Sequence, residues 1–264
     1  MNFKFLKAAF AGAILVSSNL ANAGIILYAQ DHASGDTSIA NVLSNDGHNV
    51  TSLVGGFSSG VNSDLTSNLS GYDAIFWSAS GEGSGNVHNE NQFTALLSYV
   101  FNGGNVFVTG YDSIASPFDS WLVSFVGGSG SVDLPGTDLT QLVGSNSLTT
   151  GLFDIENITP TGAYNDRDGL TGLTAGTNCL STTTGGSCQW SLRTYGAGEI
   201  AYVSAGASGS GVDPALSTNG NVYNSGLRNF AYNANMPQIP EPSTLAIFAL
   251  GIIGLASRRF KKKS

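Results

Sequence analysis

Residues 74–109 read AIFWSASGEGSGNVHNENQFTALLSYVFNGGNVFVT, and the order of elements within them sets the fold class. The apolar run 74–77 predicts a buried strand, because it is short and rich in β-branched and aromatic side chains. Apolar side chains between Phe93 and Phe101 then recur at helical spacing until Gly103-Gly104 ends them. Residues 106–109 predict a second strand, so the stretch is a strand–helix–strand unit.

The same alternation extends in both directions and predicts an α/β fold, a parallel sheet with helices on both faces. Upstream strands are expected at 25–29 and 50–54. The second half is less regular. There the sequence predicts a loop-rich β insertion at 127–186, a hairpin formed by 189–195 and 199–204, and a closing helix at 222–233.

The N-terminus has the pattern of a signal peptide spanning residues 1–23. Lys4 and Lys7 precede a short apolar run at 8–16, and Ala21-Asn22-Ala23 is a small-x-small cleavage site. Signal peptidase is therefore expected to cut between Ala23 and Gly24, so that the body of the protein lies outside the cytoplasm.

The C-terminus carries three signals in order. They are the motif Pro240-Glu241-Pro242, an uncharged apolar run at 245–256, and a basic end made of Arg258, Arg259, Lys261, Lys262 and Lys263. This tail, residues 240–263, resembles the PEP-CTERM sorting tail. The resemblance implies export in a bacterium that makes exopolysaccharide, and cleavage by exosortase, a membrane-embedded transpeptidase-like enzyme.

The hydrophobic part of the tail is short for a membrane anchor. Spanning a bilayer takes roughly 20 apolar residues, and 243–257 supplies 15. We expect a linker at 234–242 and a short transmembrane helix within 243–264, held by the basic end on the cytoplasmic side of the inner membrane. The protein is then transiently anchored before it reaches the cell surface or the medium. The alternative is an ordinary single-pass anchor.

The body between the tails is acidic and contains no lysine. Residues 24–242 hold three arginines against all 18 acidic residues of the chain, a net charge of −15. Such a surface excludes nucleic acid and anionic lipid as partners. It suits a protein that stays soluble in a polyanionic, divalent-rich matrix.

The two cysteines, Cys179 and Cys188, predict one disulfide, because an exported chain folds in an oxidising compartment. A metal-binding or catalytic thiol is the alternative.

The order of segments in the body is similar to class I glutamine-amidotransferase-like domains. The similarity rests on 25–29, 72–76, 102–108 and 193–202, and covers most of 24–233. It implies a flavodoxin-like sheet. Catalytic members use a cysteine, with a histidine partner, on a sharp strand-to-helix turn. The corresponding turn here, Thr109-Gly110-Tyr111-Asp112-Ser113, contains no cysteine, so amidotransferase activity is not expected.

In an open α/β sheet, ligands bind beyond the carboxyl ends of the strands. The candidate ligand-binding residues at those ends are Asp31, His32, Glu82 and Asp112, accompanied by Gly55, Gly56, Ser78, Ser80, Tyr111 and Ser204. Such a set suits a sugar hydroxyl or a divalent cation. The alternative is that these are polar loop residues with no ligand.

The remaining motifs are weaker indications of function. Ser58 lies in a Gly-x-Ser-x-Gly match without the firm helix that a nucleophile elbow needs. Residues 165–169 form a fragment of a calcium loop that lacks the distant glutamate, and a turn is the favoured interpretation. The three histidines are too dispersed for a metal motif, and His48 is expected to be a solvated turn residue. No cofactor is expected, with Ca²⁺ the single candidate.

Three functions remain compatible with the sequence. The leading one is a non-catalytic surface or matrix protein that binds or organises exopolysaccharide. The second is a hydrolase of matrix glycans that uses Asp31, Glu82 and Asp112 as carboxylates. The third is a self-associating structural protein.

Overall fold

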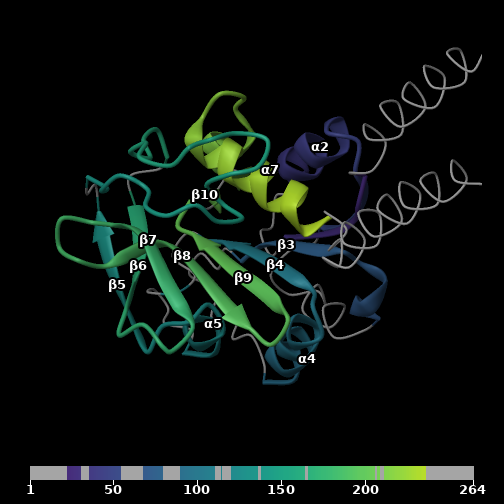
Figure 1. Ribbon diagram of the computed structural model, residues 1–264, viewed down its shortest axis with the longest axis horizontal. Helices are drawn as coiled ribbons and strands as arrows, with labels where there is room; N and C mark the ends of the chain where they lie inside the picture. Colours follow the sequence, from purple (N-terminus) through teal and green to yellow (C-terminus); the bar gives the residue numbers. More distant parts are fainter. Residues whose placement is uncertain are drawn as a thin grey trace, which may run out of the picture.

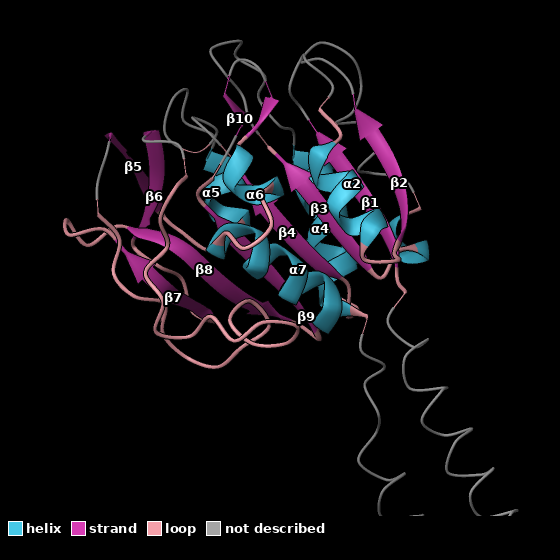
Figure 2. Ribbon diagram, turned by 90° about the horizontal axis from the view of Figure 1, so that it is seen from above, coloured by secondary structure: helices cyan, strands magenta, loops and turns pink. Residues whose placement is uncertain are grey.

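A computed structural model describes residues 23–30, 36–54, 68–79, 90–110, 114, 120–135, 138–163, 166–205, 207–208 and 211–235. Its centre is a nine-stranded sheet in the order β2-β1-β3-β4-β9-β8-β6-β5, with β7 paired to β8. The fold is therefore α/β with a central sheet, as the sequence predicts. Figure 2 shows the strands side by side, with β5 and β6 at the far end from β2.

The first half of the sheet is parallel. It contains β2 (Asn49–Val54), β1 (Ile25–Gln30), β3 (Ala74–Ser78), β4 (Asn105–Thr109) and β9 (Gly198–Val203). Of these strands, β1, β3 and β4 are buried on both faces because helices cover both sides, whereas Asn49, Thr51 and Ser52 of the edge strand β2 are exposed. All four strands expected in the first half of the chain are confirmed.

The second half of the sheet is antiparallel. It contains β8 (Cys188–Tyr195), β7 (Thr177–Thr182), β6 (Asp166–Thr171) and β5 (Gly130–Pro135). The predicted parallel sheet thus accounts for half of the strands, and an antiparallel half continues it. The expected insertion at 127–186 contributes three of these strands and extends the sheet. Between β5 and β6, the described residues 138–163 form mostly turns and irregular backbone. Two very short strands, β10 (Ala207–Ser208) and β11 (Gly211–Val212), pair separately.

Helices cover both faces of the sheet, as Figure 1 shows. On one side lie α2 (Ser38–Asn45), α6 (Pro214–Ser217) and α7 (Val222–Ala234). On the other lie α4 (Glu90–Phe101), α5 (Ser120–Phe125) and the 3₁₀ turn η1 (Leu69–Gly71). The side chains of alternate strand residues pack into two separate cores, with Phe76 facing α7 and Trp77 facing α4.

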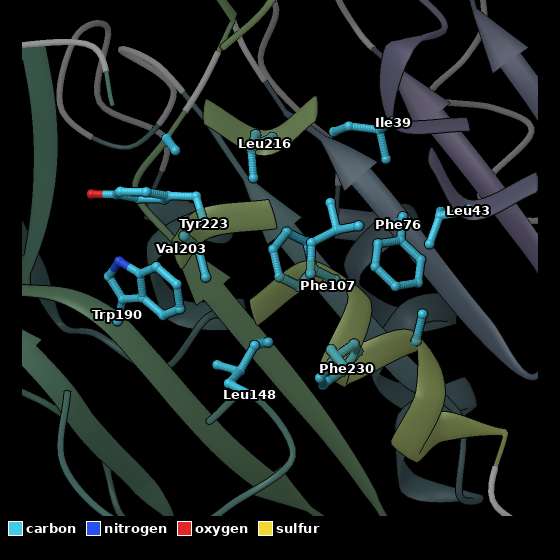
Figure 3. Close-up of a cluster of buried hydrophobic side chains, with 14 of the residues drawn as sticks. Ile39, Leu43, Phe76, Phe107, Leu148, Trp190, Val203, Leu216, Tyr223 and Phe230 are labelled. Atoms are coloured by element: carbon cyan, nitrogen blue, oxygen red, sulfur yellow. The ribbon is translucent and has the colours of Figure 1, made fainter. Parts of the chain in front are cut away.

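The core under α7 is aromatic (Figure 3). The rings of Phe76 and Phe107 stack with centroids 5.3 Å apart, and Trp190 lies 5.0 Å from Tyr223 of α7. The Asn221 side chain caps α7 by accepting from the Tyr223 N–H. Farther along α7, the Arg228 guanidinium forms a bidentate ion pair with the Asp46 carboxylate at the end of α2, and each of the two hydrogen bonds measures 2.6 Å. These contacts fix both helices to one face.

The hairpin between β8 and β9 is confirmed, and its turn requires glycine. Gly196 has φ +65°, and a Cβ there would lie 2.5 Å from the Phe101 backbone. The Ala197 N–H donates to the Phe101 carbonyl at 3.1 Å. The tip of the hairpin is therefore pressed against the end of α4, which only a residue without a side chain allows.

Several expectations lie outside the described residues: the signal peptide up to residue 22, the linker from 236 onward and the anchor within 243–264. In the part of the chain that is described, no helix is long and apolar enough to cross a membrane.

Candidate functional site

The structure leaves most of the predicted ligand-binding set untested. Asp31, His32, Glu82 and Asp112 lie outside the described residues, as do Gly55, Gly56, Ser58, Ser80 and Tyr111. Ser78 and Ser204 are described, and both are buried at carboxyl ends of parallel strands.

A row of polar side chains crosses this carboxyl edge. Gln30, Ser78 and Thr109 are the last residues of β1, β3 and β4, and the strand register places them side by side. Their exposed fractions are 0%, 0% and 1%. They share the face of the sheet on which Tyr28, Phe76 and Phe107 contact the core. We call these three residues the polar row.

The side-chain oxygen and nitrogen atoms of the polar row have no hydrogen-bond partner among the described residues, a property that they share with Gln189, Ser191 and Ser204. Leaving a buried polar group unpaired costs about 1–3 kcal/mol, so a water molecule or a ligand that bonds these atoms would remove that cost. An amide and two hydroxyls offer donors and acceptors without charge. The row therefore offers uncharged donors and acceptors at the carboxyl edge, where open α/β sheets bind ligands. Its side chains are fully buried, so a ligand reaches them only when this edge opens.

A second polar cluster lies on the opposite face, around the buried Asp168 of β6. The Ile114 N–H donates to its Oδ2 at 3.1 Å, and the Tyr202 hydroxyl donates to its backbone carbonyl at 3.1 Å. Burial raises the pKa of Tyr202 well above its ordinary range, and the Asp168 charge raises it further. This tyrosine is therefore a neutral hydrogen-bond donor at all physiological pH values.

The described part of the calcium-loop fragment, residues 166–169, is not a turn. From Asp166 onward it belongs to β6, paired with β5, so the expectation of a turn was wrong. Asp168 consequently points into the protein, with an exposed fraction of 1%. The described residues contain no group of three or more His, Cys, Asp or Glu side chains that could hold a metal ion.

Two hollows lie at the opposite, amino edge of the sheet, where no sequence pattern predicts them. They measure about 550 and 460 Å³ and share Gly103 and Ala234. Their polar lining includes Asn68, Asp73, Tyr99 and Asn102 in the first, and Asn105, Ser147, Glu199 and Asn233 in the second. The large hollows and the polar row are thus at different edges. We place the candidate site at the polar row, because it lies at the carboxyl edge, where open α/β sheets bind ligands. In the second hollow, the Glu199 carboxylate is already bonded to Ser147 at 2.6 Å.

His48 is not the solvated turn residue that its sequence position suggested. Its exposed fraction is 7%, and its Nδ1 accepts a hydrogen bond from the Gly24 N–H at 3.1 Å. Burial lowers the pKa of His48, while Asp46 and Asp73 act in the opposite direction.

The predicted disulfide between Cys179 and Cys188 is present. Because the chain has only these two cysteines, no thiol is left to act as a nucleophile.

Comparison with known proteins defines the tail first. Residues 238–262 match the PEP-CTERM protein-sorting motif. The motif implies export, sorting to the cell surface and processing by exosortase. No curated protein matches the chain.

The body is similar in fold to solved structures of low sequence identity. One is a Thermoplasma acidophilum protein assigned to GMP synthase, 15% identical, with TM-score 0.51, covering 80% of this chain and 94% of that one. Another is the cytoplasmic protein STM3548 of Salmonella typhimurium, 15% identical, with TM-score 0.52, covering 78% and 97%. At this identity the likeness shows the fold alone.

Proposed function

We propose that this protein is an exported surface or matrix protein whose α/β body binds or organises exopolysaccharide without catalysing a reaction. The observation that carries the proposal is the match of residues 238–262 to the sorting motif. The motif directs the protein to the cell surface, where secreted polysaccharide is the abundant polar polymer.

The polar row supports a neutral glycan as the ligand. Sugar hydroxyls both donate and accept hydrogen bonds, as do the Gln30 amide and the hydroxyls of Ser78 and Thr109. Two of the three arginines of the body are already paired and do not offer a binding site for a charged ligand. Arg228 is paired with Asp46, and Arg193 donates to the Ser124 and Phe125 carbonyls at the end of α5.

The test removes the hydrogen-bonding atoms while keeping the volume of each side chain. In the triple variant Gln30→Met/Ser78→Ala/Thr109→Val, the dissociation constant for exopolysaccharide from the native host should rise at least about tenfold. The melting temperature should stay equal or rise, since unpaired buried polar atoms are removed. Co-sedimentation measures binding, and calorimetry measures melting.

Ser191→Ala is the matched control. Ser191 is a fully buried serine, but it pairs in register with Tyr202, which faces the opposite core. Its substitution should leave binding unchanged. Unaltered binding by the triple variant would overturn the location of the site. Release of reducing ends by the wild type would instead favour the glycan hydrolase that uses Asp31, Glu82 and Asp112.

A further inference from the structure

The first and last described parts of the chain meet where Gly24 lies against His48 and Asn235. We call these three residues the socket. Gly24 is buried, although Ala23 before it is exposed. The Gly24 N–H donates to Nδ1 of His48 at 3.1 Å. A Cβ on Gly24 would lie 1.5 Å from Oδ1 of Asn235, so a larger residue would displace the Asn235 side chain. Asn235 directly follows α7.

The socket holds more acceptors than a peptide group fills. The Asn235 Nδ2 donates to the Ala231 carbonyl at 2.5 Å, which fixes the orientation of the amide. Its Oδ1 is buried and, counting every described residue, has no hydrogen-bond partner. A peptide nitrogen has one proton, and in Gly24 that proton already goes to His48.

We propose that the socket binds the α-ammonium group that signal peptidase creates at Gly24. Hydrolysis of the Ala23–Gly24 peptide bond consumes one water molecule. The carbonyl carbon of Ala23 becomes a carboxylate, and the nitrogen of Gly24 becomes an amine that takes up a proton. The resulting ammonium has three protons, so it can donate to His48 Nδ1 and to Asn235 Oδ1 at the same time.

The charges around the socket favour a cation. Oδ2 of Asp73 accepts from the Ile25 N–H at 2.8 Å, one residue from the new terminus. The negative charge of Asp46 also raises the pKa of His48, although Arg228 partly neutralises the Asp46 carboxylate. A nearby carboxylate stabilises an ammonium group.

The consequence is a link between the two processing events. Cleavage of the signal peptide would strengthen the contact between the start of β1 and the end of α7, from which the sorting tail departs. The inference rests on the predicted cleavage after Ala23 and not on glycan binding.

The absence of lysine from residues 24–242 makes the test specific. In the processed protein recovered from its host, the Gly24 amine is the single primary amine of the body. We expect an N-hydroxysuccinimide ester to acylate it at least about tenfold more slowly than an exposed terminal amine, as a pKa raised by one unit would produce. Peptide mass spectrometry locates the label and confirms that the chain begins at Gly24.

The reference is a variant with one alanine inserted after Ala23, whose amine lies one residue outside the socket. Asn235→Ala should speed labelling of Gly24. Asn102→Ala is its matched control, because Asn102 donates to the Ser98 carbonyl four residues back, as Asn235 does to Ala231. Labelling of wild-type Gly24 as fast as the inserted alanine, or a chain that starts elsewhere, would overturn the proposal.

Discussion

His48 illustrates how one buried side chain makes stability depend on pH. Burial lowers its pKa from the ordinary 6.5 more than Asp46 and Asp73 raise it. The folded protein therefore resists a proton that the unfolded chain accepts. By linkage, this contribution to stability is complete above about pH 6.5 and is lost as the pH falls from 6.5 toward the pKa of the folded state.

We expect His48→Gln to remove this component. Glutamine keeps an acceptor for the Gly24 N–H but does not titrate. Urea unfolding at pH 7.5, 6.5 and 5.5 should show a smaller loss of unfolding free energy for the variant than for the wild type. The other two histidines are present in both proteins, so the difference isolates His48. Parallel curves would show that His48 titrates equally in both states.

At the scale of elements, the antiparallel half depends on the disulfide. Cys179 of β7 and Cys188 of β8 close a short loop, and the strand register shifts between them. Closing a loop of about 10 residues stabilises a fold by about 2.5–3 kcal/mol in the chain-entropy model. Cys188 also pairs in register with Leu170 of β6, so the disulfide lies where β7, β8 and β6 meet.

The double variant Cys179→Ser/Cys188→Ser should therefore lose about 2–3 kcal/mol of unfolding free energy. Its melting temperature should fall by roughly 5–10 °C. Reducing the wild type should give a similar loss, while the same reductant should not affect the variant. A variant as stable as the wild type would show that strand pairing alone holds this half.

The elements differ in how readily the sequence predicts them. The parallel strands β1, β3 and β4 consist mostly of apolar residues, and the helices α2 and α4, which follow β1 and β3, show clear periodicity. The strand β6 contains Asp166, Asp168 and Gly169, so it has neither an apolar run nor alternation. It is a strand because β5 and β8 pair with it, and such pairing between distant segments leaves no local signal.

The candidate site is predictable in position but not in its residues. The carboxyl ends of the strands follow from strand order, yet the row Gln30, Ser78 and Thr109 is predicted only in part, through Ser78. These residues are buried because helices pack over that face of the sheet. The prediction of a solvated His48 was wrong because Gly24 and Asn235, both distant in the sequence, cover this side chain.

At the scale of the whole molecule, the socket and the polar row lie at opposite edges of the sheet. Gly24 and Asn235 meet at the amino edge, and five- to six-residue strands put the carboxyl edge about 20 Å away. Residues 236–242 can span at most roughly 25 Å, less than the diameter of about 40 Å expected for a body of this size. A protein still held by its tail should therefore keep its amino edge near the membrane and its polar row directed outward.

This geometry predicts that the unprocessed protein binds polysaccharide normally. In cells without exosortase, the membrane-held form should bind exopolysaccharide with a dissociation constant within about twofold of the released form, because the edge that holds the polar row faces away from the membrane. The polar-row triple variant, held in the same membranes, should not bind. Much weaker binding by the tethered wild type, restored on release, would instead place the ligand in the hollows beside Gly103 and Ala234, which the membrane would obstruct.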